Sequence, residues 1–204
     1  MADFTAKDVQ TLRQSTGAGM MDAKKALTET GGDMDKAADY LREQGIAAAA
    51  KRSDRSQGEG VVGVYMHNQS GRPVIGVLIG LASETDFVAK SDEFIETAND
   101  LAMHAAAARP SWITRDEVPE AVLVKEQELI AAQARNEGKP DEIIDRIVEG
   151  RIGSFYKENV LLDQVFVRSD KFEGTVGELV QQLAVKMGEN ISVSKMARVE
   201  IGEN

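Results

Sequence analysis

The sequence of 204 residues contains no cysteine, which excludes disulfide bonds, thiolate nucleophiles and thiolate metal sites. It has two histidines, His67 and His104, which lie far apart in the sequence and without paired metal-ligand spacing. No apolar run approaches ~18 residues, and the first residues lack the apolar stretch of a signal peptide. We therefore expect a cytoplasmic protein without a metal site or cofactor.

Positive charge is also scarce, because 24 Lys and Arg residues face 34 Asp and Glu residues, a formal net charge of -10. A protein that coats nucleic acid needs clustered basic residues to displace counterions from phosphates, so this balance argues against direct nucleic-acid binding. An acidic surface suits protein partners or keeps a chain soluble.

Catalytic groupings are missing as well. Gly17 and Gly19 precede a predicted helix, but no Gly-Lys-Ser/Thr follows, so they do not form a P-loop. Glu84 and Asp86 are expected on an extended backbone within a short connection, and we do not expect them to act as a pair for acid and base catalysis. We therefore predict a binding protein with no catalytic residues, and we rank an enzyme far behind it.

Residues 1–46 are predicted to form a separate unit of three short helices. Thr5 and Asp33 are suitable N-caps for the first and third helices, and we expect Gly45 to end the third. Because the unit has few large apolar residues, its core is thin and its stability alone is marginal.

Two consecutive methionines, Met20 and Met21, open the second of these helices. Neighbouring positions on a helix point in different directions, so both cannot face one small core. We expect at least one at the surface, where the flexible, polarisable methionine side chain suits a partner-binding face. In the alternative, which the sequence does not exclude, both pack against Leu12 and Leu41.

The chain then passes through a boundary region, residues 47–60, that reads as a helical extension followed by a polar linker. Residues 61–204 are predicted to form an α+β core domain. Two apolar runs, 61–66 and 74–81, are joined by a glycine-containing turn and predict a hairpin. Four helices are predicted within 91–109, 120–135, 141–157 and 175–187. We expect an apolar stripe of Phe94, Ala98, Leu101 and Ala105 on the first, and a capping box of Thr175 and Glu178 at the start of the last.

A third strand is predicted at residues 191–201, where apolar and polar side chains alternate. The residues expected on its buried face are Ile191, Val193, Ala197, Val199 and Ile201. The fold class is thus α+β, with a small three-stranded antiparallel sheet and helices packed mainly on one face.

A short segment between the second strand and the next helix, residues 84–88, carries an unusual side chain for a connection. Phe87 follows the acidic Glu84 and Asp86 and precedes Ser91, a good N-cap for the next helix. It can present itself to another molecule, since connections lie at the surface and carry much of a domain's function. It can instead fold back as a core anchor, the reading that the local pattern alone favours.

Several long, ordered segments of the chain resemble the elongation factor Ts family, and together they span essentially the whole sequence. These segments are 12–27, 32–33, 41–45, 84–90, 136–140, 148–151, 161–167 and 188–190. The chain departs from the commoner family pattern at Ala23, where a cysteine is frequent. The resemblance implies that residues 1–46 form a ubiquitin-associated-like domain.

The resemblance also implies a function, guanine-nucleotide exchange on elongation factor Tu, the GTPase that delivers aminoacyl-tRNA to the ribosome. Family knowledge places Thr85, Asp86, Phe87 and Val88 at the GTPase domain. Phe87 would wedge between helices near the bound Mg2+, and displacement of that ion would release GDP. The expected partner is elongation factor Tu, both GDP-bound and nucleotide-free, with no direct nucleic-acid or membrane contact.

The same carry-over assigns a docking role to Arg13, Met20, Met21 and Lys24 on another face of the GTPase domain. Short members of the family can also associate through the sheet, so a non-covalent homodimer that uses the same sheet edge from each copy is expected. Lys195 and Arg198 near that edge would oppose such pairing.

A runner-up function is a free-standing peptide-binding or chaperone module built on the N-terminal helices. It predicts that residues 1–46 suffice for activity and that residues 84–88 are dispensable.

Overall fold

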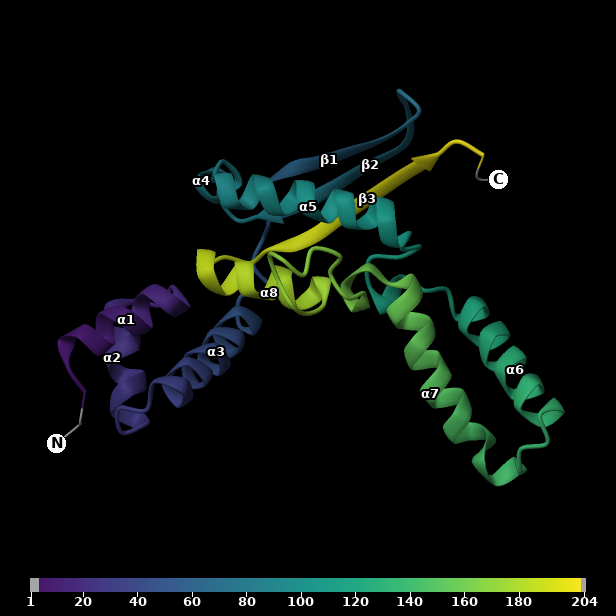
Figure 1. Ribbon diagram of the computed structural model, residues 1–204, viewed down its shortest axis with the longest axis horizontal. Coiled ribbons are helices and arrows are strands. Elements are labelled where there is room, and N and C mark those ends of the chain that lie inside the picture. The colour runs from purple at the N-terminus through teal and green to yellow at the C-terminus, as the bar shows by residue number, and fades with distance from the viewer. Residues whose placement is uncertain (1–3, 203–204) are drawn as a thin grey trace.

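The computed structural model describes residues 4–202 (Figure 1). The helices are α1 (Ala6–Thr16), α2 (Met20–Glu29), α3 (Met34–Ala50), α4 (Asp86–Ala89), α5 (Asp92–Ala108), α6 (Glu120–Asn136), α7 (Asp141–Asn159) and α8 (Val176–Met187), with short 3-10 turns η1 (Arg115–Glu117) and η2 (Leu161–Asp163). The strands are β1 (Glu59–Gln69), β2 (Arg72–Ser83) and β3 (Ser192–Glu200). None of the helices in residues 4–202 is both long and apolar enough to cross a membrane.

The three N-terminal helices pack around a small cluster of their own, at the opposite end of the molecule from α6 and α7 (Figure 1). Thr5 and Asp8 form a capping box at the start of α1, and the Asp33 side chain accepts from the Lys36 amide at the start of α3. The buried residues of this cluster are Val9, Leu12, Ala23, Ala26, Leu27 and Ala37. The predicted division of the chain into domains at residue 46 stays a prediction.

The prediction that Gly45 ends the third helix is wrong, because α3 continues through it to Ala50. The reason lies in another part of the chain. A Cβ atom built on Gly45 would lie 2.5 Å from a methyl group of Val185 in α8. Glycine is therefore needed for close packing of α3 on α8, a role that a local helix-stop signal does not reveal.

The sheet is antiparallel, with strand order β1-β2-β3, which together with the helices confirms the predicted α+β class. α5 lies along one face of the sheet (Figure 1). Its predicted stripe of Phe94, Ala98, Leu101 and Ala105 is fully buried. At Gly63 of β1 a Cβ would lie 2.1 Å from the Ala98 carbonyl oxygen, so only glycine allows this approach.

The predicted buried face of the third strand is wrong beyond Val193. Gly80 of β2 pairs with Lys195, but its neighbour Leu81 pairs with Val193, so Ser194 is an extra residue in a bulge. One additional residue moves every later side chain to the other face of the sheet. Met196 therefore packs against the core, while Ala197, Val199 and Ile201 are exposed.

The bulge leaves one face of the sheet largely apolar and open. Val64 of β1, Leu78 of β2 and Ala197 of β3 lie side by side in register, and all are exposed. Val62, Met66 and Val199 extend this exposed face along the strands.

The helices predicted at 120–135 and 141–157 are α6 and α7, which run antiparallel and project away from the sheet (Figure 1). Ile130, Ala134 and Ile144 are buried along them. The chain then returns to α8, where the predicted capping box of Thr175 and Glu178 is present.

Candidate partner-binding surface

The segment of residues 84–88, here called the tip segment, forms the start of a single helical turn after β2. Thr85 is the N-cap of α4, and its hydroxyl accepts from the Val88 amide at 3.4 Å. The expected extended backbone is therefore wrong from Asp86 onward. Successive side chains of a capped helical turn point in different directions, so the side chains of Phe87 and Val88 face different surroundings.

Phe87 leaves 84% of its surface exposed, more than any other large apolar side chain of the described residues. The core-anchor reading of Phe87 is wrong. The anchor is the next residue, because Val88 is 6% exposed and joins the main core together with Ala89. Val88 was predicted to contact the partner, but in this structure its buried side chain fixes the turn from which Phe87 projects.

Ser91 precedes α5 as predicted, but its side chain does not cap that helix. Its hydroxyl donates instead to the Val88 carbonyl at 2.8 Å, which closes the α4 turn. The base of the tip segment is therefore held by apolar burial and by hydrogen bonds on both sides.

Asp86 lies beside Phe87 and is also exposed. Its carboxylate accepts from the Lys90 ammonium at 2.6 Å, one helical turn away. This bond and the positive charge hold the pKa of Asp86 below its usual range, so the carboxylate stays charged at neutral pH. The tip thus offers a large apolar ring next to a negative charge.

The predicted docking residues Arg13, Met20, Met21 and Lys24 are all exposed, and we call them the methionine surface. Met20 and Met21 leave 49% and 74% of their surfaces exposed. The alternative in which both pack against Leu12 and Leu41 is therefore wrong. Met20 and Lys24 are four residues apart on α2 and so share a face of that helix.

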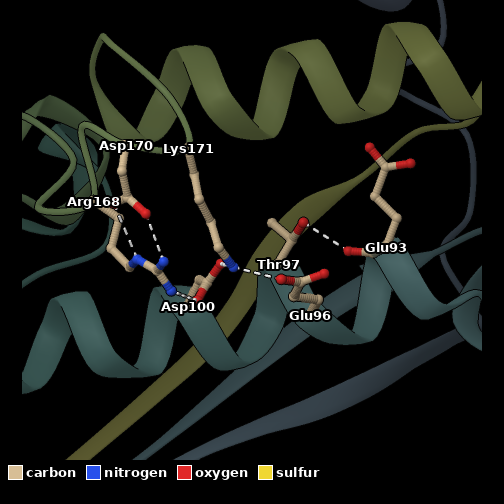
Figure 2. A network of polar contacts seen from close by, with 7 residues as sticks. All are labelled: Glu93, Glu96, Thr97, Asp100, Arg168, Asp170 and Lys171. Carbon is tan, nitrogen blue, oxygen red and sulfur yellow. Dashed lines mark hydrogen bonds and ion pairs between the residues drawn. The ribbon is translucent and has the colours of Figure 1, made fainter.

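A groove of about 310 Å³ lies between α5 and α8, near the N-terminal end of α5. Figure 2 shows that charged side chains cross it: Lys171 pairs with Glu96 at 2.5 Å and with Asp100, and Arg168 contacts Asp100 at 3.5 Å. These ion pairs lower the pKa of Glu96 and raise that of Lys171. The network ties the segment before α8 to α5, and it assembles no nucleophile beside a free base.

Sequence reasoning assigned no role to Glu189 and Asn190, although their segment is among those that resemble the family. In the structure both reach the tip segment. The Glu189 carboxylate accepts from the Thr85 hydroxyl at 2.5 Å, and the backbone amide of Asn190 donates to the Glu84 carboxylate at 2.7 Å. A polar pair that directly follows the last helix was the only available signal. Its partners lie about a hundred residues away and could not be found from the sequence.

Among residues 4–202 no cluster of three or more His, Asp or Glu side chains is arranged to hold a metal ion. His67 is exposed in β1, and His104 is buried in α5, where it contacts Gln164 at 3.0 Å. The described residues therefore present two exposed candidate features, the tip segment and the methionine surface.

The family model described as Elongation factor TS matches residues 3–203. The chain belongs to the elongation factor Ts family. The protein named Elongation factor Ts from Thermoanaerobacter sp. (strain X514) is 53% identical over 200 residues, which cover 98% of this chain and 96% of that protein. The Elongation factor Ts of Moorella thermoacetica is 50% identical, over 98% of this chain and 96% of that protein. The Elongation factor Ts of Desulforamulus reducens is also 50% identical, over 100% of this chain and 91% of that protein.

Proposed function

We propose that this chain is the guanine-nucleotide exchange factor for elongation factor Tu in translation elongation, and that it acts in the cytoplasm without chemistry of its own. Membership of the elongation factor Ts family supports this function. The observation that carries the mechanism is the 84% exposure of Phe87 on a capped and anchored turn. An aromatic ring held outside the core in this way is available to enter a partner.

Exchange of this kind is a coupling between two ligands of one GTPase. The factor must bind the nucleotide-free GTPase more tightly than the GDP-bound form, and by reciprocity it then weakens GDP to the same degree. GTPases hold the nucleotide through a phosphate-binding loop and a bridging Mg2+. In our proposal Phe87 enters between helices near that ion, and the charged Asp86 lies beside it.

Displacement of Mg2+ removes a dominant positive charge from the phosphate site, so the nucleotide leaves. The buried Val88 would supply the resistance that a wedge needs, because the turn carrying Phe87 is held by the core. Thr85, the cap of that turn, completes the proposed contact segment.

The methionine surface would dock the N-terminal helices on another face of the GTPase domain. Exposed methionines adapt their shape to a partner at little cost, and Arg13 and Lys24 add positive charge to a molecule with a net charge of -10. We also propose that these three helices have the ubiquitin-associated-like arrangement. Two separate contacts to one partner raise the effective concentration of the second once the first has formed.

The decisive experiment follows release of fluorescent GDP from elongation factor Tu with excess unlabelled GDP, with and without this chain. We expect release to become faster as the chain is added. The same titration after Mg2+ removal by a chelator tests the mechanism, because a factor that acts by displacing Mg2+ gains little once the ion is gone. No acceleration at saturating chain would contradict the proposed function.

The runner-up, a peptide-binding or chaperone module, is tested by the GDP-release assay with the whole chain and by a peptide-binding titration with a fragment of residues 1–46. It predicts full activity of that fragment toward unfolded peptides and no effect of the whole chain on GDP release.

A non-covalent homodimer is a further proposal about partners. In place of the predicted sheet edge, we propose the open face of the sheet as the contact, since Val64, Leu78 and Val199 are exposed there without a covering element among residues 4–202. Contiguous exposed apolar surface of this kind marks an interaction site. Two sheets stacked face to face around a two-fold axis would bury it.

Sedimentation equilibrium across a wide concentration range tests the dimer. We expect a mass near twice 22.1 kDa that falls on dilution, and the Leu78→Lys variant should shift the equilibrium to the monomer. Val165→Lys, which alters another exposed valine outside the sheet, serves as the control. A single monomer mass at tens of micromolar would contradict the proposed dimer.

A further inference from the structure

Glu189 makes an unusual number of bonds to the tip segment. Its Oε2 accepts from the backbone amides of Glu84 at 3.0 Å and Thr85 at 3.2 Å, and its Oε1 accepts from the Thr85 hydroxyl at 2.5 Å. One carboxylate thus receives three donors from two consecutive residues immediately before α4. Hydrogen bonds to an ionised carboxylate are shorter and stronger than neutral ones.

The bond to the hydroxyl has a directional consequence. When Thr85 donates its proton to Glu189, the hydroxyl lone pairs are free to accept from the Val88 amide at 3.4 Å, which is the N-cap bond of α4. Glu189 therefore orients the group that caps the turn carrying Phe87. In this arrangement Glu189 acts on Phe87 through Thr85.

Asn190 extends the connection to a third part of the chain. Its amide donates to the Glu84 carboxylate at 2.7 Å, and its side-chain nitrogen donates to the carbonyls of Ser53 at 3.0 Å and Arg55 at 2.9 Å. Ser53 and Arg55 follow the end of α3, the last helix of the N-terminal unit. Arg55 also contacts Glu84 at 3.5 Å.

Resting on the exchange function proposed above, we propose that Glu189 and Asn190 are positioning residues that hold Phe87 in a fixed relation to the N-terminal helices. Docking of the methionine surface can help to place Phe87 in the partner only if the connection between the two regions is stiff. A loose tip would have to be ordered during each encounter, at a cost that a pre-organised tip avoids.

The variant Glu189→Gln tests this role, because an amide places an NH2 donor where the structure needs an acceptor. We expect catalysed GDP release to slow by about tenfold, as for the loss of a charge-assisted hydrogen bond. Glu117→Gln is the matched control, since Glu117 also accepts from a loop amide, that of Ile113 at 2.8 Å, outside the tip. Exchange by the control variant should match that of the original chain.

A double-mutant cycle with Phe87→Ala separates positioning from other roles. If Glu189 acts through Phe87, Glu189→Gln has less than about a twofold effect once the ring is gone, because the cycle then shows full coupling. Equal effects in both backgrounds would overturn the proposal, since they would mean a direct partner contact or a general loss of fold. Unchanged exchange by Glu189→Gln would overturn it as well.

Amide hydrogen exchange of the free chain provides a readout that does not depend on elongation factor Tu. We expect Glu189→Gln to raise exchange at residues 84–88 and to leave the β2 amides protected. If the original chain does not accelerate GDP release, the proposed function fails and the role of the pair in exchange fails with it, while unaltered amide exchange at 84–88 in an active chain would reject the positioning alone. Should Glu189→Gln not fold, Glu189→Asp keeps the charge but withdraws the carboxylate from the tip segment by one methylene group, and the same outcomes decide.

Discussion

The two proposed contact regions of this molecule are built in opposite ways. The methionine surface lies on a small unit where three of the buried residues are the alanines Ala23, Ala26 and Ala37. The tip segment stands on the main core, whose buried residues include Phe94 and Leu101, and polar bonds from Glu189 hold it as well. A flexible side chain on a thin support suits adaptable docking, whereas a wedge needs a stiff support.

The largest expected effect comes from breaking the thinner core. Leu27 is fully buried in the N-terminal cluster, so Leu27→Ala should destabilise that unit by about 2–5 kcal/mol. Because so small a unit has little stability to lose, we expect α1–α3 to unfold while the sheet and α5 stay protected. Amide hydrogen exchange resolved along the chain measures this, and loss of protection in α5 to the same extent would mean that the two regions unfold together.

Loss of the Phe87 ring should give the next largest effect. Phe87→Ala removes a ring that, if central in the complex, contributes ~2 kcal/mol or more to binding of the nucleotide-free GTPase. GDP release should slow by at least about tenfold, while the melting temperature stays unchanged because the ring is exposed in the free chain.

The control for this variant is Val165→Ala, which truncates another exposed apolar side chain. It should leave GDP release unaffected. If Phe87→Ala melts early and retains full exchange activity per folded molecule, the ring supports the fold and is not a wedge.

A smaller loss is expected from the adaptable surface. Replacing Met20 and Met21 by alanine together should weaken docking by about 1 kcal/mol and lower exchange mainly at low concentrations of the chain. The maximal rate at saturation should be retained, in contrast to Phe87→Ala. A titration of GDP release against chain concentration separates the two, and an unchanged curve would show that the methionine surface is not an interface.

The smallest effect concerns pH and the main core. His104 is fully buried, and its Nδ1 accepts from the Val167 amide at 3.3 Å, so the neutral ring fits the site. Burial lowers the pKa of His104 from its ordinary 6.5, while the bond to Gln164 opposes this in part. The unfolded chain therefore binds a proton near pH 6.5 that the folded chain does not, and stability falls as the pH drops below that value.

Urea unfolding midpoints between pH 7.5 and pH 5 measure this dependence. His104→Gln should remove the part due to this ring, although its overall stability differs, and His67→Gln should preserve it because His67 is exposed. Identical pH dependence in all three chains would assign it to other groups.

Much of the architecture follows from local patterns. The stripe Phe94–Ala98–Leu101 placed α5 on the sheet correctly, and the Thr175 and Glu178 box marked the start of α8. For the candidate site the sequence located Phe87 but not its direction, which depends on where the α4 turn begins. It placed two methionines at a helix start but left their burial open.

Local patterns sufficed for the order of the longer helices and strands, the α+β class, the absence of thiol chemistry and the family, because periodicity, caps and ordered motifs act within a few residues of one another. Three features needed the packed structure: α3 runs through Gly45, β3 reverses its faces at Ser194, and Glu189 reaches Thr85. Each of these depends on a partner far along the chain: Val185, Gly80 or the tip segment. Such pairings are set by the close packing of the whole molecule, which no local pattern contains.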